Sequence, residues 1–144
     1  MKKKPEYYYY QSGVIPYRLK NKELQIMLIS TRRGRNWTVP KGIIKEKLED
    51  SESAIKEAFE EAGLIGNLDE TISWQFRFRK WGGICDVTLY PMKVDKELDD
   101  FPERKEREKK WLNVKEAAKM VKFDKVRDYI LELEKLHRDG YNNL

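Results

Sequence analysis

The chain has 144 residues, of which 30 are Lys or Arg and 25 are Asp or Glu, giving a formal net charge of +5. This length predicts one domain over residues 1–144, large enough to bury a core without disulfides. A single cysteine, Cys85, and a single histidine, His137, exclude an intrachain disulfide, a cysteine-rich zinc site and most histidine-based catalysis. Any acid–base or metal chemistry must therefore use carboxylates.

The cellular location and the kind of partner follow from charge and hydropathy. Residues 1–4 are basic, but Pro5, Glu6 and four tyrosines stand where a signal peptide would be apolar. The longest apolar run, residues 26–29, is too short to cross a membrane. We expect a cytoplasmic protein without membrane contact. The modest positive charge favours an anionic partner, which is either a small phosphorylated ligand or nucleic acid.

The first half of the chain begins with strands. Residues 7–18 are rich in aromatic and β-branched side chains and predict a strand interrupted at Gly13 and Pro16. A turn at residues 21–22 and a strand over residues 24–31 would complete a hairpin. A basic loop over residues 32–35 precedes a short extended piece, residues 37–39, which ends at Pro40.

A polar loop then leads to a helix, with Asp50 or Ser51 as its N-cap and Gly63 at its end. Residues 71–79 alternate between apolar and polar side chains, which predicts a strand with one buried face. After a turn at residues 81–83, residues 84–94 are more uniformly apolar and predict a more buried strand.

Residues 95–110 form a charged segment that we interpret as a loop, and residues 111–112 are interpreted as a short strand. Two helices are predicted at the end of the chain, one over residues 114–120 and one from residue 124. The order of strands, helix, strands and helices favours a mixed α/β fold, in which helices cover the faces of a mixed sheet.

The helix before Gly63 carries the most informative pattern. At about 100° per residue, Glu57, Glu60 and Glu61 share one arc of the helix. The opposite arc is apolar and is expected to face the core; it consists of Ile55, Ala58, Phe59 and Ala62. Glutamates three and four residues apart repel one another, and a hard cation such as Mg²⁺ or Mn²⁺ would reverse that effect. A carboxylate cluster is more often a solvated face, so the helix alone leaves both interpretations open.

The segment from Gly42 to Leu64 resembles the Nudix box, G-x5-E-x7-R-E-U-x-E-E-x-G-U, where U is apolar. Five residues match its charged and glycine positions: Gly42, Glu57, Glu60, Glu61 and Gly63. Lys56 stands where the pattern has Arg, and Leu48 stands where it has its first Glu.

The resemblance extends beyond the box over nearly the whole chain. Residues 12–15 look like the first strand of Nudix hydrolases, and residues 37–42 look like the usual entry to the box. Residues 101–103, followed by 111–112, are similar to members that cleave diadenosine polyphosphates or diphosphoinositol polyphosphates.

The resemblance implies an α/β/α sandwich around a mixed sheet, and a hydrolase that cleaves phosphoanhydride bonds in nucleoside diphosphate derivatives or related compounds. It implies that Glu57, Glu60 and Glu61 bind Mg²⁺ or Mn²⁺. Lys56 would brace these carboxylates more weakly than the usual Arg, because an ammonium lacks the planar fork of a guanidinium. Glu49, or else Glu46, is a hypothetical partial substitute for the carboxylate missing at Leu48.

Basic residues near the box are the candidates for phosphate binding. We expect contacts from Lys41 and Gly42, with further candidates on the preceding loop and on a later strand: Arg32, Arg33, Arg35 and Arg77. Solvation is the alternative interpretation of these arginines. Glu103 or Glu106, on the charged segment, is the candidate general base by analogy with the family.

Three functions are distinguished. The first is a Mg²⁺-dependent hydrolase of a dinucleoside polyphosphate or a diphosphoinositol polyphosphate. The second is a catalytically weakened module that binds a phosphorylated ligand without turnover, which Leu48 and Lys56 favour. The third is RNA processing, but the chain lacks a clustered basic helix and a paired aromatic platform, so nucleic acid is not the expected partner. Either a monomer or a homodimer is compatible with the sequence.

Overall fold

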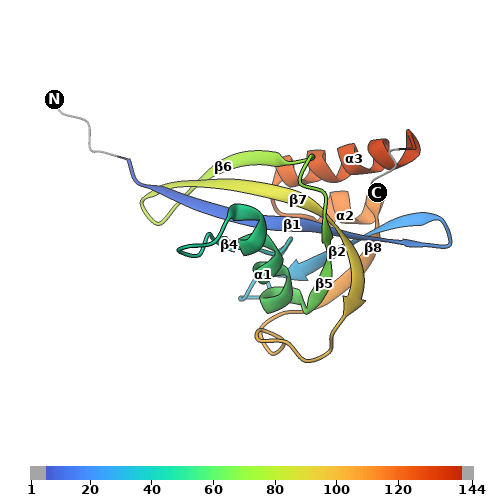
Figure 1. Ribbon diagram of the computed structural model, residues 1–144, viewed down its shortest axis with the longest axis horizontal. Coiled ribbons are helices and arrows are strands. Elements are labelled where there is room, and N and C mark those ends of the chain that lie inside the picture. Colours follow the sequence, from blue (N-terminus) through green and yellow to red (C-terminus); the bar gives the residue numbers. More distant parts are fainter. Residues whose placement is uncertain (1–5, 141–144) are drawn as a thin grey trace.

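The computed structural model describes residues 6–140, so the basic residues 1–4 lie outside the described part (Figure 1). Its elements, in chain order, are β1 (Tyr8–Lys20), β2 (Glu23–Ser30), β3 (Trp37–Thr38), β4 (Lys41–Ile43), α1 (Asp50–Ala62), β5 (Leu64–Leu68), β6 (Trp74–Lys80), β7 (Gly83–Glu97), β8 (Lys109–Asn113), α2 (Val114–Met120) and α3 (Asp124–Arg138).

The strands form one mixed sheet with β1 and β7 at its centre. The main path runs β3-β2-β1-β7-β5, while β4 pairs with β1, β6 with β7 and β8 with β2. The β1–β7 pair is parallel, and the other pairs are antiparallel. The predicted hairpin is confirmed: Asn21 and Lys22 both adopt positive φ, as two-residue hairpin turns require.

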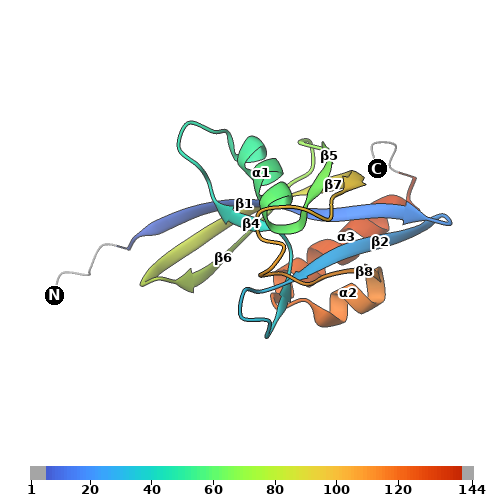
Figure 2. The same ribbon diagram turned by 90° about the horizontal axis from the view of Figure 1, so that it is seen from below.

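Helices cover both faces of the sheet, with α1 on one side and α2 and α3 on the other (Figure 2). Successive residues of β1 point to opposite faces, so Val14 packs in the cluster with α1 and Ile15 packs in the cluster with α2 and α3. Ala54, Ala58 and Ala62 line the α1 side of the core. The α/β/α sandwich expected from the sequence is confirmed.

The buried face of α1 matches the predicted apolar arc only in part. Ala58 and Ala62 are buried, whereas Ile55 and Phe59 are 42% and 38% exposed. All the buried side chains of the helix are small or acidic, namely Ser53, Ala54, Glu57, Ala58, Glu61 and Ala62. Small side chains let the helix backbone lie close to β1 and β4, and this close approach places Glu57 and Glu61 against β4.

Strand β1 passes through Gly13 and Pro16 without interruption, contrary to the sequence prediction. Along one edge, β1 pairs with β4 up to Gly13 and with β2 only from Tyr17 onwards. Pro16 lies in the interval between these partners, where the missing N–H breaks no ladder on that edge. The two residues therefore mark a change of partner and not a break in the strand.

Several further elements differ from the sequence prediction. The short strands β4 and β5 were not predicted; β5 pairs with the end of β7. The charged segment interpreted as a loop over residues 95–110 is strand at both ends, since β7 extends to Glu97 and β8 begins at Lys109. The N-cap of α1 is Glu49 and not Asp50 or Ser51; the backbone N–H of Glu49 donates to Glu52 Oε1 at 3.2 Å in a capping box.

Between residues 6 and 140, no helix combines the length and the apolar character needed to span a bilayer.

Candidate functional site

Two buried glutamates on α1 form the centre of the site. Glu57 and Glu61 lie one turn apart on the helix and are 4% and 6% exposed. Burial raises the pKa of Glu61 to about 8; the Arg107 charge opposes this shift, and the neighbouring Glu57 and Glu103 add to it. The pair is an acidic centre removed from water.

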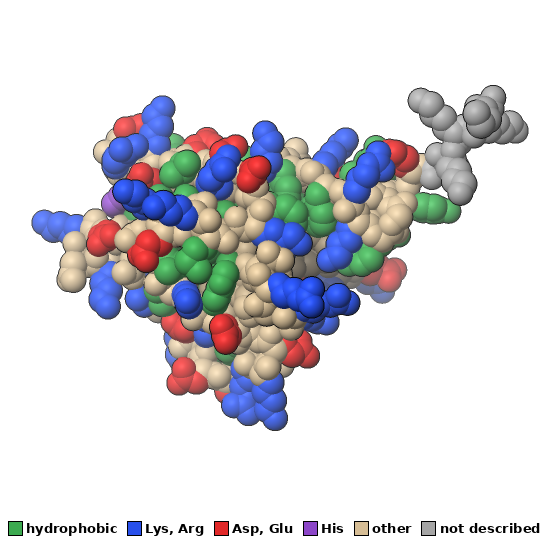
Figure 3. All heavy atoms as spheres, turned by 180° about the vertical axis from the view of Figure 1, so that it is seen from behind, with side chains coloured by type: hydrophobic (Ala, Val, Ile, Leu, Met, Phe, Trp, Pro, Cys, Tyr) green, Lys and Arg blue, Asp and Glu red, His purple; other side chains and the backbone are tan. Residues whose placement is uncertain are grey.

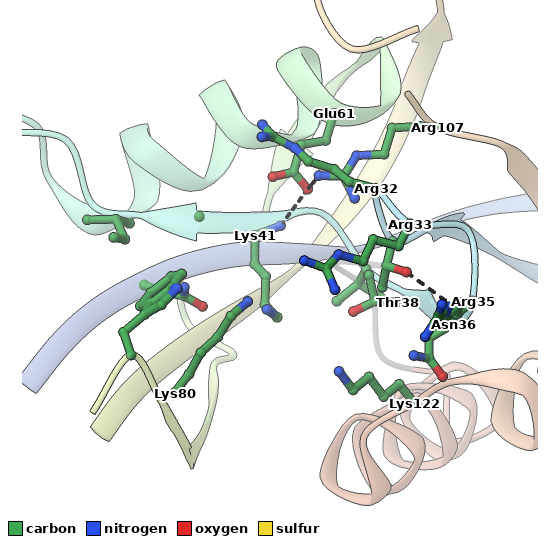
Figure 4. Close-up of a pocket in the computed structure, with 16 residues that line it drawn as sticks. Arg32, Arg33, Arg35, Asn36, Thr38, Lys41, Glu61, Lys80, Arg107 and Lys122 are labelled. Carbon is green, nitrogen blue, oxygen red and sulfur yellow. Dashed lines mark hydrogen bonds and ion pairs between the residues drawn. The ribbon is translucent and has the colours of Figure 1, made fainter. Parts of the chain in front are cut away.

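The backbone of strand β4 lies directly against Glu57 and Glu61. The backbone N–H of Lys41 donates to Glu61 Oε1 at 3.2 Å (Figure 4). A Cβ atom on Gly42 would lie 2.4 Å from Cδ of Glu57, so only glycine leaves room for this carboxyl group. The structure thus brings Lys41 and Gly42 together with Glu57 and Glu61.

Arg107 connects the acidic pair to the segment between β7 and β8. Its Nη2 lies 3.0 Å from Glu103 Oε1 and 3.6 Å from Glu61 Oε1, and its Nη1 donates to the Ser30 carbonyl at 2.9 Å. The Arg107 side chain is 9% exposed. The sequence analysis missed this residue, because it lies in a run of mixed charges whose only local signal is its spacing of four from Glu103.

Glu60 and Lys56 lie on the same helix as Glu57 and Glu61 and form an ion pair with each other. Lys56 Nζ is 4.0 Å from Glu60 Oε1, and the Glu60 side chain is 24% exposed. Among residues 6–140, no three His, Cys, Asp or Glu side chains are grouped in a way that would hold a metal ion. The structure thus brings Glu57 and Glu61 together and leaves Glu60 at the rim.

The loop between β4 and α1 places a cation against Glu57 and no carboxylate in the position of Leu48. Lys45 Nζ lies 3.6 Å from Glu57 Oε1. Glu49, the hypothetical substitute for a carboxylate at Leu48, is engaged in the capping box of α1 and is exposed. Glu46 is also exposed.

A cavity of about 680 Å³ opens beside Glu61 and is strongly basic (Figure 4). The charged residues that line it are Arg32, Arg33, Arg35, Lys41, Lys80, Arg107, Lys122 and, as the one acid among the described lining residues, Glu61. Seen from behind, the molecule shows Lys and Arg side chains gathered around a hollow (Figure 3). Such a wall matches a ligand with several negative charges.

The predicted phosphate-binding arginines divide into two groups. Arg32, Arg33 and Arg35 line the cavity, and Arg32 also pairs with Glu103 at 3.4 Å and Glu106 at 3.5 Å. Arg77 does not line it: its Nη2 lies 3.1 Å from Asp86 Oδ2 on the neighbouring strand. The ion pair between Arg77 on β6 and Asp86 on β7 therefore accounts for the position of the Arg77 side chain.

Lys41 extends its side chain away from Glu61, into an aromatic corner. Its Nζ lies 5.1 Å from the ring centroid of Phe78 and 5.4 Å from that of Phe123. Burial lowers the pKa of Lys41 to about 8; the Glu61 charge opposes the shift, and Lys80 and Lys122 add to it. The sequence analysis missed Lys80 and Lys122, which come from β6 and from the connection between α2 and α3.

Comparison with known proteins relates both the sequence and the fold to one family. The family model described as NUDIX domain matches residues 10–133. Nudix hydrolase 21, chloroplastic, from Arabidopsis thaliana is 32% identical over 123 residues, which cover 81% of this chain and 61% of that protein. Nudix hydrolase 12, mitochondrial, from the same plant is 34% identical over 135 residues, covering 78% of this chain and 66% of that protein.

Solved structures share the fold at low identity. A binary complex of an Ap4A hydrolase from C. elegans has a TM-score of 0.78 at 18% identity, covering 89% of this chain and 96% of that one. The NUDIX domain of Shewanella oneidensis NrtR, solved with ADP ribose, has a TM-score of 0.66 at 13% identity, covering 91% and 90%. The chain spans about two thirds or less of the two plant relatives described above, and nearly all of these solved domains.

Proposed function

Because this chain belongs to the NUDIX domain family, we propose that it hydrolyses a phosphoanhydride bond in a small polyphosphorylated molecule. The observation that carries the proposal is the buried Glu57–Glu61 pair, of which Glu61 lines a cavity whose other charged lining residues, among those described, are all cations. The cations suit the phosphate chain, and the carboxylates suit the reacting end. The proposed substrates are a dinucleoside polyphosphate or a diphosphoinositol polyphosphate.

The donor set fits a divalent cation. Glu57 and Glu61 offer hard oxygen ligands one helix turn apart in a buried position, which is the chemistry that Mg²⁺ and Mn²⁺ prefer. Glu60 is the proposed third ligand, since it lies on the same helix and its contact with Lys56 is long, at 4.0 Å. When bound, such a cation neutralises phosphate oxygens and lowers the pKa of water.

The remaining residues of the site have roles that follow from their charge and position. Arg32, Arg33 and Arg35 bind phosphate oxygens from the β2–β3 loop, as charge-assisted hydrogen bonds favour. Glu103 is the proposed acceptor of the proton from the attacking water. Arg107 is a positioning residue, because it holds Glu103 and Glu61 in one arrangement through a single guanidinium.

A second function is favoured by a specific observation. Lys45 lies against Glu57, Lys56 replaces an arginine, and Leu48 offers no carboxylate. These features favour a module that binds a phosphorylated ligand without turnover.

A location in the cytoplasm also stays a prediction, because the relatives compared above are named as chloroplastic or mitochondrial.

The two functions separate in one experiment. The protein is incubated with diadenosine tetraphosphate, and separately with a diphosphoinositol polyphosphate, in the presence of Mg²⁺ or Mn²⁺, and the products are resolved by ion-exchange chromatography. The hydrolase proposal expects product that accumulates with time and disappears with EDTA. Micromolar binding by calorimetry without product would support the binding module instead.

Substitution of Gly42 tests the close contact between β4 and Glu57. Gly42→Ala is expected to lower kcat/KM by about 10²-fold, because the added Cβ displaces the Glu57 carboxyl group from its position. The melting temperature should change little, since the displaced atoms are the end of a flexible side chain. Wild-type turnover in this variant, or a loss of activity matched by unfolding, would contradict the assigned role of Glu57.

A further inference from the structure

A second hollow continues the cavity on the side away from Glu61. Its volume is about 410 Å³, and it shares Thr31, Thr38, Lys41, Lys80 and Lys122 with the main cavity. Phe78, Arg79 and Phe123 complete its lining, so no carboxylate is present among the described residues around it. We call this hollow the lysine lobe.

Three ammonium groups face the lysine lobe without an acidic partner. Within the described chain, no carboxylate lies within 4.0 Å of Lys41, Lys80 or Lys122, whereas Arg79 is paired with Glu6 at 3.1 Å. In Figure 4 the side chains of Lys41 and Lys80 reach toward the same space. Lys41 is half-buried, whereas Lys80 and Lys122 are exposed at the mouth of the hollow. Like charges that share one hollow repel, and a bound anion would reverse the sign of that interaction.

Thr38 provides an independent observation. It is 7% exposed, and its Oγ1 is buried without a hydrogen-bond partner in the described structure. Thr38 lines the lysine lobe together with Lys41 and Lys122, and all three are labelled around the pocket in Figure 4. A buried hydroxyl without a partner is unfavourable in a folded protein, and a small shift of Thr38 toward the lysine lobe would let a ligand oxygen supply that partner.

We propose that Thr38, Lys41, Lys80 and Lys122 bind a second phosphoryl group of the ligand, remote from the bond next to Glu57 and Glu61. Lys41 joins the two ends, because its backbone N–H donates to Glu61 while its side chain enters the lysine lobe. The ligand is therefore one whose phosphates extend beyond a single diphosphate. The role of this subsite in catalysis rests on the proposed function, whereas anion binding does not depend on turnover.

A nucleobase stacked on Phe78 and Phe123 is the competing occupant. Both rings already carry an ammonium on their faces, since Lys41 lies over both and Lys122 Nζ lies 5.2 Å from the Phe123 centroid. Both rings also pack against the core cluster of α2 and α3. The basic lining and the orphaned hydroxyl therefore favour phosphate.

Binding of inorganic tripolyphosphate, measured by calorimetry without divalent cations, tests the proposal directly. Lys80→Met and Lys122→Met should each weaken binding by about tenfold, the equivalent of one charge-assisted hydrogen bond. Lys125→Met removes the same charge from an exposed position outside the lysine lobe and should stay within about twofold of wild type. Equal affinity for Lys122→Met and Lys125→Met would overturn the proposal.

Thr38→Val separates binding from folding. The variant should melt at or above the wild-type temperature, because it removes a buried hydroxyl without a partner, yet it should bind tripolyphosphate about fivefold more weakly. Unchanged tripolyphosphate affinity would overturn the role of Thr38. Adenosine binding that is lost in Phe123→Leu, with tripolyphosphate binding intact in the lysine variants, would assign the lysine lobe to a base instead.

Kinetics distinguish a failure of the subsite from a failure of the proposed function. With diadenosine tetraphosphate, Lys122→Met should raise KM by about tenfold while kcat stays within about threefold. Absence of turnover in the wild-type protein would refute the hydrolase but leave the tripolyphosphate result standing. Turnover with a KM that is the same in wild type, Lys80→Met and Lys122→Met would refute the subsite alone.

Discussion

Glu61→Gln is expected to lower kcat/KM by about 10²- to 10⁴-fold, the range for loss of an essential acid–base or ligand group. The same variant should not melt below wild type when both are measured with EDTA. Burial raises the pKa of Glu61 from 4.5 to about 8, so the folded state holds a proton that the unfolded state releases. Wild type should therefore lose stability relative to the variant as pH rises from about 4.5 to about 8.

The matched control for this prediction is Glu116→Gln on α2, which removes an exposed carboxylate from outside the cavity lining. It should retain wild-type kcat/KM and show no comparable trend of melting temperature with pH. Calorimetric titration with Mn²⁺ adds a readout besides turnover, since Glu61→Gln should bind the ion more weakly. Wild-type turnover in Glu61→Gln would refute the proposed centre on α1.

Arg107→Met is expected to have the largest effect on stability. The substitution leaves Glu61, Glu103 and the Ser30 carbonyl without their shared guanidinium, and breaking a buried ion pair costs about 3–5 kcal/mol. At about 2–4 °C per kcal/mol for a protein of this size, the melting temperature should fall by roughly 10 °C. Thermal denaturation by circular dichroism measures the difference.

Two further variants define the cause of this loss. Arg104→Met lies three residues earlier on the same segment, but its partner Asp100 is 93% exposed, so it should melt close to wild type. Arg107→Lys keeps the charge without the planar fork and should melt between wild type and Arg107→Met. If Arg107→Met and Arg104→Met lose stability equally, the bridge does not hold the segment to α1.

Much of the fold follows from local patterns. The alternation of apolar and polar residues over positions 71–79 predicted the buried face of β6, where Trp74 and Phe76 are 5% and 6% exposed. Gly63 ends α1 with φ of 66°, the left-handed conformation that glycine adopts most readily, and the helix stops where the sequence placed its end. The strand β5 was missed because it is only five residues long, has a single buried side chain, and shows no regular alternation of apolar and polar residues in its sequence.

The candidate site was predictable only where its residues are close in sequence. Glu57 and Glu61 share a helix turn, and Lys41 and Gly42 belong to the segment that resembles the Nudix box, so a local pattern was enough to select them. Periodicity erred on the same helix: it assigned the core to Ile55 and Phe59, because it measures hydrophobicity and not the space between helix and sheet.

The sequence by itself determined the order of the helices and of the longer strands, the family resemblance and the acidic turn of α1, since each depends on residues a few positions apart. Only the tertiary structure decided that Arg107 bridges Glu61 and Glu103, and that Thr38, Lys80 and Lys122 meet in the lysine lobe. These residues come from β3, β6, the segment before β8 and the connection after α2. Their association depends on how the sheet pairs and how the helices pack, and long-range pairing leaves no local signature in the chain.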